Sequence, residues 1–277
     1  MRGQYALRLM CRVLSVSRSG YYHWKSRPDS NRYKFRQVVK EYVIKTYWEF
    51  KRTYGAPRIA EELREKDIPC SHNHAAVLLG EAGLKAKNGI RFKYTKPGES
   101  TKNVCNNLLL RNFKAYRPDQ KWVTDITYIR VCGKWMYLAV IMDLYSRFIV
   151  GWSIDTQVTE LIVCNAFEMA IGRRNVTEHM LIHSDQGVQY RSKVYQDMLR
   201  DYGCQISMSR KGNCWDNAAM ESFFSRLKVE LIYGERFRNF DHLRQEVFEY
   251  IEIFYNRKRR HSALGYKSPL QFERLVL

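Results

Sequence analysis

The stretch Lys121-Trp-Val-Thr-Asp-Ile-Thr-Tyr-Ile129 is the part of the sequence from which the fold can be worked out. Its β-branched and aromatic residues predict a strand over 121–129. Gly133 marks a turn, and two further stretches rich in Val, Ile, Tyr and Trp follow at 135–144 and 147–154. The chain from 121 onward is therefore expected to begin with three consecutive strands.

The later segments alternate between helix and strand. Apolar residues at helical spacing predict helices, and short apolar runs predict the remaining strands. The expected elements are a helix over 158–172, a strand over 180–184, a helix over 193–202, a strand over 205–208, and helices over 218–232 and 241–256. This order predicts an α/β fold of the ribonuclease H-like class, a mixed five-stranded sheet with helices on both faces.

Three acidic residues stand in distinctive settings. Asp125 lies near the middle of the first strand, Asp185 follows a short strand in His183-Ser-Asp-Gln-Gly187, and Glu221 lies in Trp215-Asp-Asn-Ala-Ala-Met-Glu-Ser-Phe-Phe224. The first two acids are separated by 59 residues and the last two by 35. Converging carboxylates can hold two hard divalent cations, which can clamp the attacking and leaving oxygens of a phosphodiester. The sequence therefore predicts a metal-dependent enzyme that acts on nucleic acid.

The helix that carries Glu221 is amphipathic. Glu221, Ser225 and Lys228 lie along one row, because seven residues bring a helix nearly back to the same azimuth. Such a helix can present a carboxylate and a cation side by side. Its apolar stripe, which we expect to anchor it against the sheet, consists of Met220, Phe223, Phe224, Leu227 and Leu231.

Other polar residues of this half allow more than one interpretation. Asp143, Asp155 and Asp216 are rival acids, but Asp143 could cap the turn at Ser146 and Asp216 could cap the helix that carries Glu221. His183 could shuttle protons or order Asp185, although a hydrogen-bonded structural histidine is the favoured interpretation.

The front half of the chain is helical and strongly basic. Residues 1–120 carry a net charge of +15 and residues 121–277 a net charge of +4, which predicts a polyanion-binding module beside a catalytic one. Two short helices are expected within 1–26, with Ser17 as a cap. They resemble a helix-turn-helix, with an ordinary helical hairpin as the alternative, and a longer helix is expected over 31–50. Helices over about 57–66 and 71–83 then form a second helix-turn-helix candidate. The last of these has no Lys or Arg, so the basic residues that follow it are expected to supply phosphate contacts: Lys85, Lys87, Arg91, Lys93 and Lys96.

These patterns predict three parts in the chain. Residues 1–85 form a helical DNA-binding region, 86–120 a basic linker, and 121–277 the catalytic core with its C-terminal helices. The seven cysteines include no Cys-x-x-Cys pair, which favours reduced thiols over a disulfide framework or a cysteine zinc site. The sequence has no signal peptide or membrane-spanning run, so we expect a cytoplasmic protein of a bacterium, associated with the nucleoid when bound to DNA.

Several motifs resemble a known family. The back half resembles the integrase catalytic core shared by retroviral integrases and many bacterial insertion-sequence transposases. The motifs resemble still more closely those of the second-reading-frame (OrfB) transposases of two-frame insertion sequences. Residues 11–24 and 54–83 resemble the same family. The matching stretches are Trp122-Val-Thr-Asp-Ile-Thr-Tyr128, Asp143-Leu-Tyr-Ser-Arg-Phe-Ile-Val-Gly-Trp152, His183-Ser-Asp-Gln-Gly187, Ser207-Met-Ser-Arg-Lys-Gly-Asn-Cys-Trp-Asp-Asn217, Glu221-Ser-Phe-Phe224 and Tyr255-Asn-Arg-Lys-Arg-Arg-His-Ser-Ala-Leu-Gly-Tyr266.

The resemblance implies metal-dependent cleavage and strand transfer during transposition of an insertion sequence. Asp125, Asp185 and Glu221 would be the metal ligands, holding two Mg²⁺ ions for which Mn²⁺ can substitute. The zinc module of retroviral integrases is absent, so no zinc is expected. Lys228 matches a residue that contacts DNA near the active site. Further DNA contacts are expected from Arg18, Lys85, Lys87, Arg210, Lys211, Arg226, Arg257, Lys258, Arg259 and Arg260.

The resemblance also suggests partners. Element ends and target DNA are the expected substrates, and the need to hold two ends together favours a homo-oligomer on DNA. A first-frame (OrfA) product, or a fusion with it, is a further expected partner. Two other functions stay open on the sequence alone, a structure-selective nuclease and a non-catalytic DNA-binding regulator. The intact acidic triad argues against the regulator, and the basic helical front half argues against a minimal nuclease.

Overall fold

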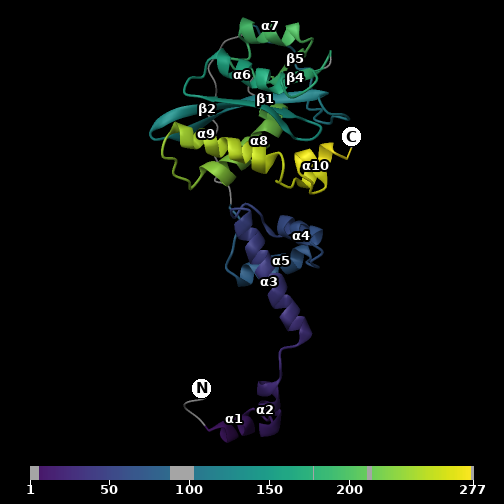
Figure 1. The fold of residues 1–277 in the computed structure, drawn as a ribbon, viewed down its shortest axis with the longest axis vertical. Coiled ribbons are helices and arrows are strands. Elements are labelled where there is room, and N and C mark those ends of the chain that lie inside the picture. Colours follow the sequence, from purple (N-terminus) through teal and green to yellow (C-terminus); the bar gives the residue numbers. More distant parts are fainter. Residues whose placement is uncertain (1–5, 88–102, 177, 211–213, 276–277) are drawn as a thin grey trace. The chain divides into compact units, whose positions relative to one another are not determined.

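The computed structural model describes residues 6–87, 103–176, 178–210 and 214–275. The chain divides into two compact units, residues 1–86 and 87–277, and each is described by itself (Figure 1). Within the described residues, no helix is both long and apolar enough to cross a membrane.

The second unit is built on a five-stranded mixed sheet with the order β3-β2-β1-β4-β5. The first three strands pair antiparallel as consecutive hairpins. β4 and β5 add parallel to the other edge of β1, which makes β1 the central strand. The strand bounds are β1 Lys121–Val131, β2 Lys134–Asp143, β3 Ile149–Asp155, β4 Leu181–Ser184 and β5 Gln205–Met208. The predicted sheet is confirmed.

Helices cover both faces of this sheet, as the sequence predicted (Figure 1). Side chains alternate along β1, so Val123 and Ile129 join one apolar cluster while Trp122 joins the other. The first cluster contains residues of α8 (Ala218–Leu227) and α9 (Phe240–Phe248). The second contains residues of α6 (Glu160–Ile171) and α7 (Lys193–Asp201).

Two of the expected long helices change their hydrogen-bonding pattern part-way. α8 follows the 3₁₀ turn η1 (Cys214–Asn217) and continues as the π-helical segment η2 (Lys228–Ile232). α9 likewise continues as the π-helical segment η3 (Glu249–Tyr255). The chain ends with the 3₁₀ turn η4 (Ser262–Leu264) and the helix α10 (Pro269–Glu273).

The apolar stripe predicted for the α8 helix is confirmed. Met220, Phe223, Phe224, Leu227 and Leu231 are all buried in the cluster that contains Val123 and Ile129 of β1. The stripe therefore fixes the helix that carries Glu221 to the sheet face toward which Asp125 alternates.

The first unit is helical, with α1 (Leu7–Val13), α2 (Arg18–Ser26), α3 (Asn31–Glu49), α4 (Ala56–Glu65) and α5 (His72–Glu81). The Ser17 side chain caps α2 by accepting from the Gly20 amide, as predicted. α5 buries Ala75, Leu78 and Leu79, whereas Ala76 is exposed.

The predicted linker, residues 86–120, falls only partly within the described residues. Residues 88–102, with Arg91, Lys93 and Lys96, lie outside the described residues. Residues 103–120 are not a spacer, because they are part of the second unit and pack within it. Leu109 is buried in its core, and the Asn103 amide donates to the Arg191 carbonyl. A basic composition gave no sign of these contacts, which join residues about a hundred positions apart in the chain.

Candidate active site

Asp125 lies in the central strand of the sheet, on the face covered by α8. Its neighbours two and four positions away, Val123 and Ile129, belong to the apolar cluster of that face. One carboxylate oxygen accepts a hydrogen bond from the Ile126 amide at 2.8 Å. The side chain keeps part of its surface exposed, so it sits at a boundary between the core and the solvent.

Asp185 follows directly after β4, the parallel neighbour of β1. Its Oδ1 accepts from the Gly187 amide at 2.8 Å, which folds the Asp-Gln-Gly turn around the carboxylate. A Cβ on Gly187 would lie 2.9 Å from that same Oδ1, closer than real Cβ atoms come. A Cβ at position 187 would therefore displace the Asp185 carboxylate, which occupies the space that the Cβ would need.

Burial and mutual repulsion set the electrostatics of these two acids. Burial raises the pKa of Asp125 well above its usual value, and the charges of Asp185 and Glu221 raise it further, while Lys228 opposes the shift. Burial also raises the pKa of Asp185, opposed by the Gly187 amide and the charge of Arg191. The structure thus brings Asp125 and Asp185 together, with Glu221 and Lys228 within electrostatic range of Asp125.

Glu221 and Lys228 lie on the helix row that borders its apolar stripe. Glu221, in the first turn of α8, is exposed, and Lys228 is half-buried. Burial lowers the pKa of Lys228, while the negative charge of Asp125 raises it. Within the described ranges no three His, Cys, Asp or Glu side chains already converge as a metal cluster, so the three acids are near one another without being closed around one point.

The favoured interpretation of His183 is confirmed. Its ring is fully buried and is hydrogen-bonded at both nitrogens, Nδ1 to Ser207 Oγ at 2.7 Å and Nε2 to Ser209 Oγ at 3.2 Å. Burial lowers the pKa of His183 to about 4. The histidine is therefore a neutral structural residue that ties β4 to β5 just before Asp185.

Two rival acids have structural roles. Asp143 ends β2 and accepts from the Tyr145 amide and the Ser146 hydroxyl, so it caps the turn as predicted. Asp216 was expected to cap α8, and this is wrong, because its side chain is fully buried and accepts from other groups. Its donors are Asn107 Nδ2 at 2.9 Å, Arg111 Nε at 2.8 Å and Arg210 Nε at 3.0 Å.

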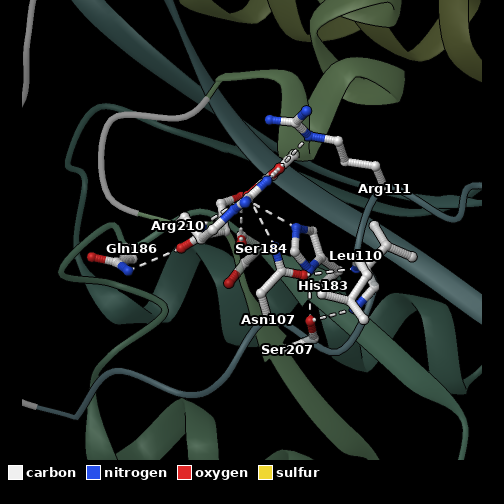
Figure 2. A network of polar contacts seen from close by, with 11 residues as sticks. Asn107, Leu110, Arg111, His183, Ser184, Gln186, Ser207 and Arg210 are labelled. Carbon is white, nitrogen blue, oxygen red and sulfur yellow. Dashed lines mark hydrogen bonds and ion pairs between the residues drawn. The ribbon is translucent and has the colours of Figure 1, made fainter.

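Asn107, Arg111 and Arg210, which lie together in Figure 2, all donate to Asp216, so this network joins segments far apart in the sequence. Asn107 and Arg111 come from the segment before β1, and Arg210 follows β5. Hydrogen bonds from Arg210 and Arg111 hold the pKa of Asp216 well below its usual range. The network fixes the turn η1, from which α8 and Glu221 continue.

Two of the predicted DNA contacts are corrected by the structure. Arg259 is buried and pairs with Glu230, its Nε 2.8 Å from Oε2 and its Nη2 2.7 Å from Oε1. Arg260 is also buried and donates to the Tyr266 carbonyl. Their guanidinium groups face protein partners, because the basic run turns inward after two exposed residues, Arg257 and Lys258.

The other predicted basic contacts have varied surroundings. Arg226, Arg18 and Lys85 are exposed, and Arg210 is 57% exposed while paired with Asp216. Lys87 donates to the Glu230 carbonyl and pairs with Glu235 at 3.2 Å, so its ammonium is engaged within the second unit. Lys211 lies outside the described residues.

Comparison with known proteins decides the family. Family models of the integrase core domain match residues 115–214 and 202–269, and a model of an HTH-like domain matches residues 34–91. The chain is 43% identical over 274 residues to the transposase InsF for insertion sequence IS3A of Escherichia coli K12, covering 98% of this chain and 95% of that one. This chain belongs to the integrase-core transposases of insertion sequences.

The chain is also similar to other known proteins. The transposase is also 41% identical over 240 residues to the transposase for insertion sequence element IS904 of Lactococcus lactis, covering 86% of this chain and 94% of that one. Among solved structures, the HTLV-2 integrase catalytic core domain in complex with magnesium is similar at 16% identity and a TM-score of 0.45, over 58% of this chain and 99% of that one.

Membership of the family gives the activity. The transposase binds DNA and carries out DNA transposition and integration, cutting and joining strands as integrase cores do. Integrase cores act with divalent cations. The HTH-like match, residues 34–91, includes α4 and α5, the second of the two helix-turn-helix candidates.

Sequence reasoning missed two residues that shape the site. Gly187 leaves room for the Asp185 carboxylate, and Asn217 connects the start of α8 to β1. Both had a visible signal, since they lie two residues after Asp185 and four before Glu221. A polar or glycine residue at such short spacing from a candidate ligand is worth testing as its support.

Proposed function

We propose that Asp125, Asp185 and Glu221 hold the divalent cations with which this transposase cuts and joins DNA. The observation that carries the proposal is the pair formed by Asp125 and Asp185, two partly buried acids in or directly after neighbouring parallel strands. Both have raised pKa values, so a bound cation would stabilise their ionised forms. A third acid, Glu221, is within electrostatic range on the adjacent helix. Hard oxygen donors in this number suit Mg²⁺.

The donor set fits two Mg²⁺ ions, with Asp125 shared between them. Asp185 would complete one ligand pair and Glu221 the other. When bound, such ions activate a water or a 3′-hydroxyl and stabilise the leaving oxygen at phosphorus. Glu221 is exposed, so its side chain would turn toward Asp125 when the ions and DNA bind.

The chain's own residues orient the carboxylates and receive the DNA. The amides of Ile126 and Gly187 each hold one oxygen of an aspartate, which leaves the second oxygen of each free to act as a ligand. The ammonium of Lys228 lies within range of Asp125, where it would contact a phosphate next to the scissile bond.

Exposed basic residues would extend the DNA surface. Arg226 lies on α8 itself, and Arg257 and Lys258 follow η3. Arg18 and Lys85 would contribute from the first unit, and Arg210 keeps half of its surface available beside Asp216. Two element ends must be joined, so we infer a homo-oligomer on DNA, with an OrfA-type product or fusion as a further partner.

A strand-transfer assay with labelled element ends and Mg²⁺ tests the proposal. Asp125→Asn is expected to abolish both cleavage and joining and to weaken Mn²⁺ binding measured by calorimetry. Asp241→Asn, on an acid of α9 that is 85% exposed, is the matched control and should act like the wild type. Joined products from Asp125→Asn would overturn the metal assignment, and cleavage without joining in the wild type would favour a structure-selective nuclease.

A further inference from the structure

Asn217 occupies the junction between the turn η1 and the helix α8. It is the residue before Ala218, where α8 begins, and it precedes Glu221 by four positions. Only 5% of its surface is exposed. Its side chain does not cap the helix that follows, although asparagine at this position usually does so. The side-chain amide of Asn217 therefore has a role other than capping the helix.

The amide of Asn217 connects α8 to the central strand. Its Nδ2 donates to the Thr124 carbonyl at 3.2 Å, and Thr124 is the residue before Asp125. The orientation of the amide is fixed by this bond, because a flip would place Oδ1 against the carbonyl oxygen. One side chain thus joins the backbone beside the first acid to the helix that carries the third.

The other end of the same amide is unsatisfied. Asn217 Oδ1 is buried and has no hydrogen-bond partner among the described residues. A buried acceptor left unpaired costs about 1–3 kcal/mol, so it indicates a group that binds there. Tyr195 Oη is in the same condition, but it lies in the apolar cluster on the opposite face of the sheet.

A second asparagine of the same unit shows the purely structural arrangement. Asn256 is fully buried, and its Nδ2 donates to the Ile149 carbonyl at 3.0 Å while its Oδ1 accepts from the Ile149 amide at 2.8 Å. Both ends of that amide are satisfied by the first residue of β3. Among the described residues, the Asn217 side chain, in contrast, makes only the hydrogen bond from its Nδ2, to the carbonyl of Thr124, the residue before Asp125.

The neighbouring residue holds the same turn from another side. Asp216 is fixed by Arg210, Arg111 and Asn107. The backbone on which Asn217 sits is therefore held independently of the Thr124 contact. Replacing the Asn217 side chain should for this reason alter the site more than the fold.

We propose that Asn217 is a positioning residue for the carboxylate site, which sets the helix of Glu221 against the strand of Asp125 through Nδ2 and offers Oδ1 as a hydrogen-bond acceptor to a metal-bound water. The inference rests on the proposed metal site. It assigns the residue a role in cation affinity that a capping or packing asparagine would not have, because groups that orient ligands typically change metal affinity by about 10–100-fold.

The test is Mn²⁺ binding by the full chain, measured by calorimetry and by the free-Mn²⁺ signal in electron paramagnetic resonance. Asn217→Ala is expected to bind Mn²⁺ about 10-fold more weakly, with a fall in Tm of about 2–4 °C. Asn256→Ala is the matched control and should lower Tm at least as much while leaving Mn²⁺ affinity within about twofold of the wild type. Asn217→Ser, which keeps a hydroxyl and leaves a smaller void, should show the same loss of affinity if the alanine variant does not fold.

Wild-type Mn²⁺ affinity in Asn217→Ala or Asn217→Ser would overturn the proposal, as would an equal loss of affinity in Asn256→Ala. Failure of the metal site itself is seen separately in Asp125→Asn. If that variant binds Mn²⁺ like the wild type, the assignment of the acids is wrong, whatever the asparagine variants do.

Discussion

The buried and partly buried acids of the second unit have two opposite electrostatic environments. Glu230 is buried with Arg259, both side chains being 3% exposed, and two hydrogen bonds join them while the Tyr250 hydroxyl donates to the same carboxylate. Asp125 and Asp185 instead stand near each other, accept from backbone amides, and have raised pKa values. One region neutralises its negative charge and the other accumulates it.

The difference separates a structural acid from a functional one. A carboxylate that joins two helical segments is stable when an arginine and a hydroxyl satisfy it, and Asp216 follows the same rule with Arg210 and Arg111. Carboxylates whose repulsion is left in place destabilise the protein unless a cation binds. Strained electrostatics of this kind gather at functional sites, which supports the assignment of the two aspartates.

The largest effect is expected from breaking the repulsive pair. Asp185→Asn should reduce strand transfer by about a thousandfold or more, since a neutral amide is a poor ligand for Mg²⁺. The same variant should raise the metal-free Tm, because the charge that repels Asp125 is gone. Strand-transfer rates and thermal unfolding in a chelating buffer measure both. A lower Tm than that of the wild type would contradict the comparison.

The next largest effect is expected from breaking the neutralised pair. Arg259→Met leaves Glu230 buried without its cation and should cost about 3–5 kcal/mol in the free energy of unfolding. The double variant with Glu230→Gln should recover much of this loss, because no charge is then left unpaired. Urea unfolding of the two single variants and the double variant measures the coupling. Additive losses would show that the pair is not an interacting unit.

Asp143 extends the comparison, because its titration should make the free energy of unfolding depend on pH. The pKa of Asp143 is raised to about 7, mainly by burial and also by the charges of Asp119 and Glu273, against the opposing effects of the Tyr145 amide and the charge of Arg174. Because the folded pKa exceeds the unfolded value, the fold binds the proton more tightly. This contribution to stability is complete below about pH 4 and is lost as the pH rises through 7, by on the order of 4 kcal/mol.

Asp143→Asn should remove that slope, since an amide does not titrate. Urea unfolding at several values between pH 4.5 and 7.5 measures the free energy of unfolding for the wild type and the variant. The difference between them should shift in favour of the variant as the pH rises. A constant difference would mean that Asp143 is not held protonated by the fold.

The smallest effect is expected from a methyl group beside Asp185. Gly187→Ala places a Cβ 2.9 Å from the carboxylate oxygen, so the carboxylate must move by a few tenths of an ångström. Strand transfer should fall by about 10–100-fold, with little change in Tm. Gly80→Ala is a matched control, because its Cβ would meet nothing within 4 Å. Wild-type activity in Gly187→Ala would show that the position of Asp185 is not critical.

The sheet, its order of elements and the family were predictable from the sequence, because apolar periodicity and short motifs are local properties. The strand over 121–129 and the stripe from Met220 to Leu231 are confirmed with small changes of boundary. The proximity of Asp125 to Asp185 followed from the same reasoning, since adjacent strands place them at one site.

Contacts between distant polar residues were not predictable. Arg259 looked like a surface cation because its own stretch is basic, whereas its partner Glu230 lies 29 residues earlier. Asp216 looked like a helix cap, whereas Arg111, which pairs with it, lies 105 residues earlier. Periodicity places a side chain on a face, but only the tertiary fold decides which charges meet there.

The π-helical segment η2 affects how this transposase is compared with its relatives. A segment whose hydrogen bonds span five residues instead of four fits one more residue into the same length of helix. Residues counted from Glu221 keep regular α-helical spacing up to Leu227, where α8 ends and the π-helical segment begins. An alignment gap of one residue between Lys228 and Ile232 would then reflect a change of helix type and not the loss of a functional position.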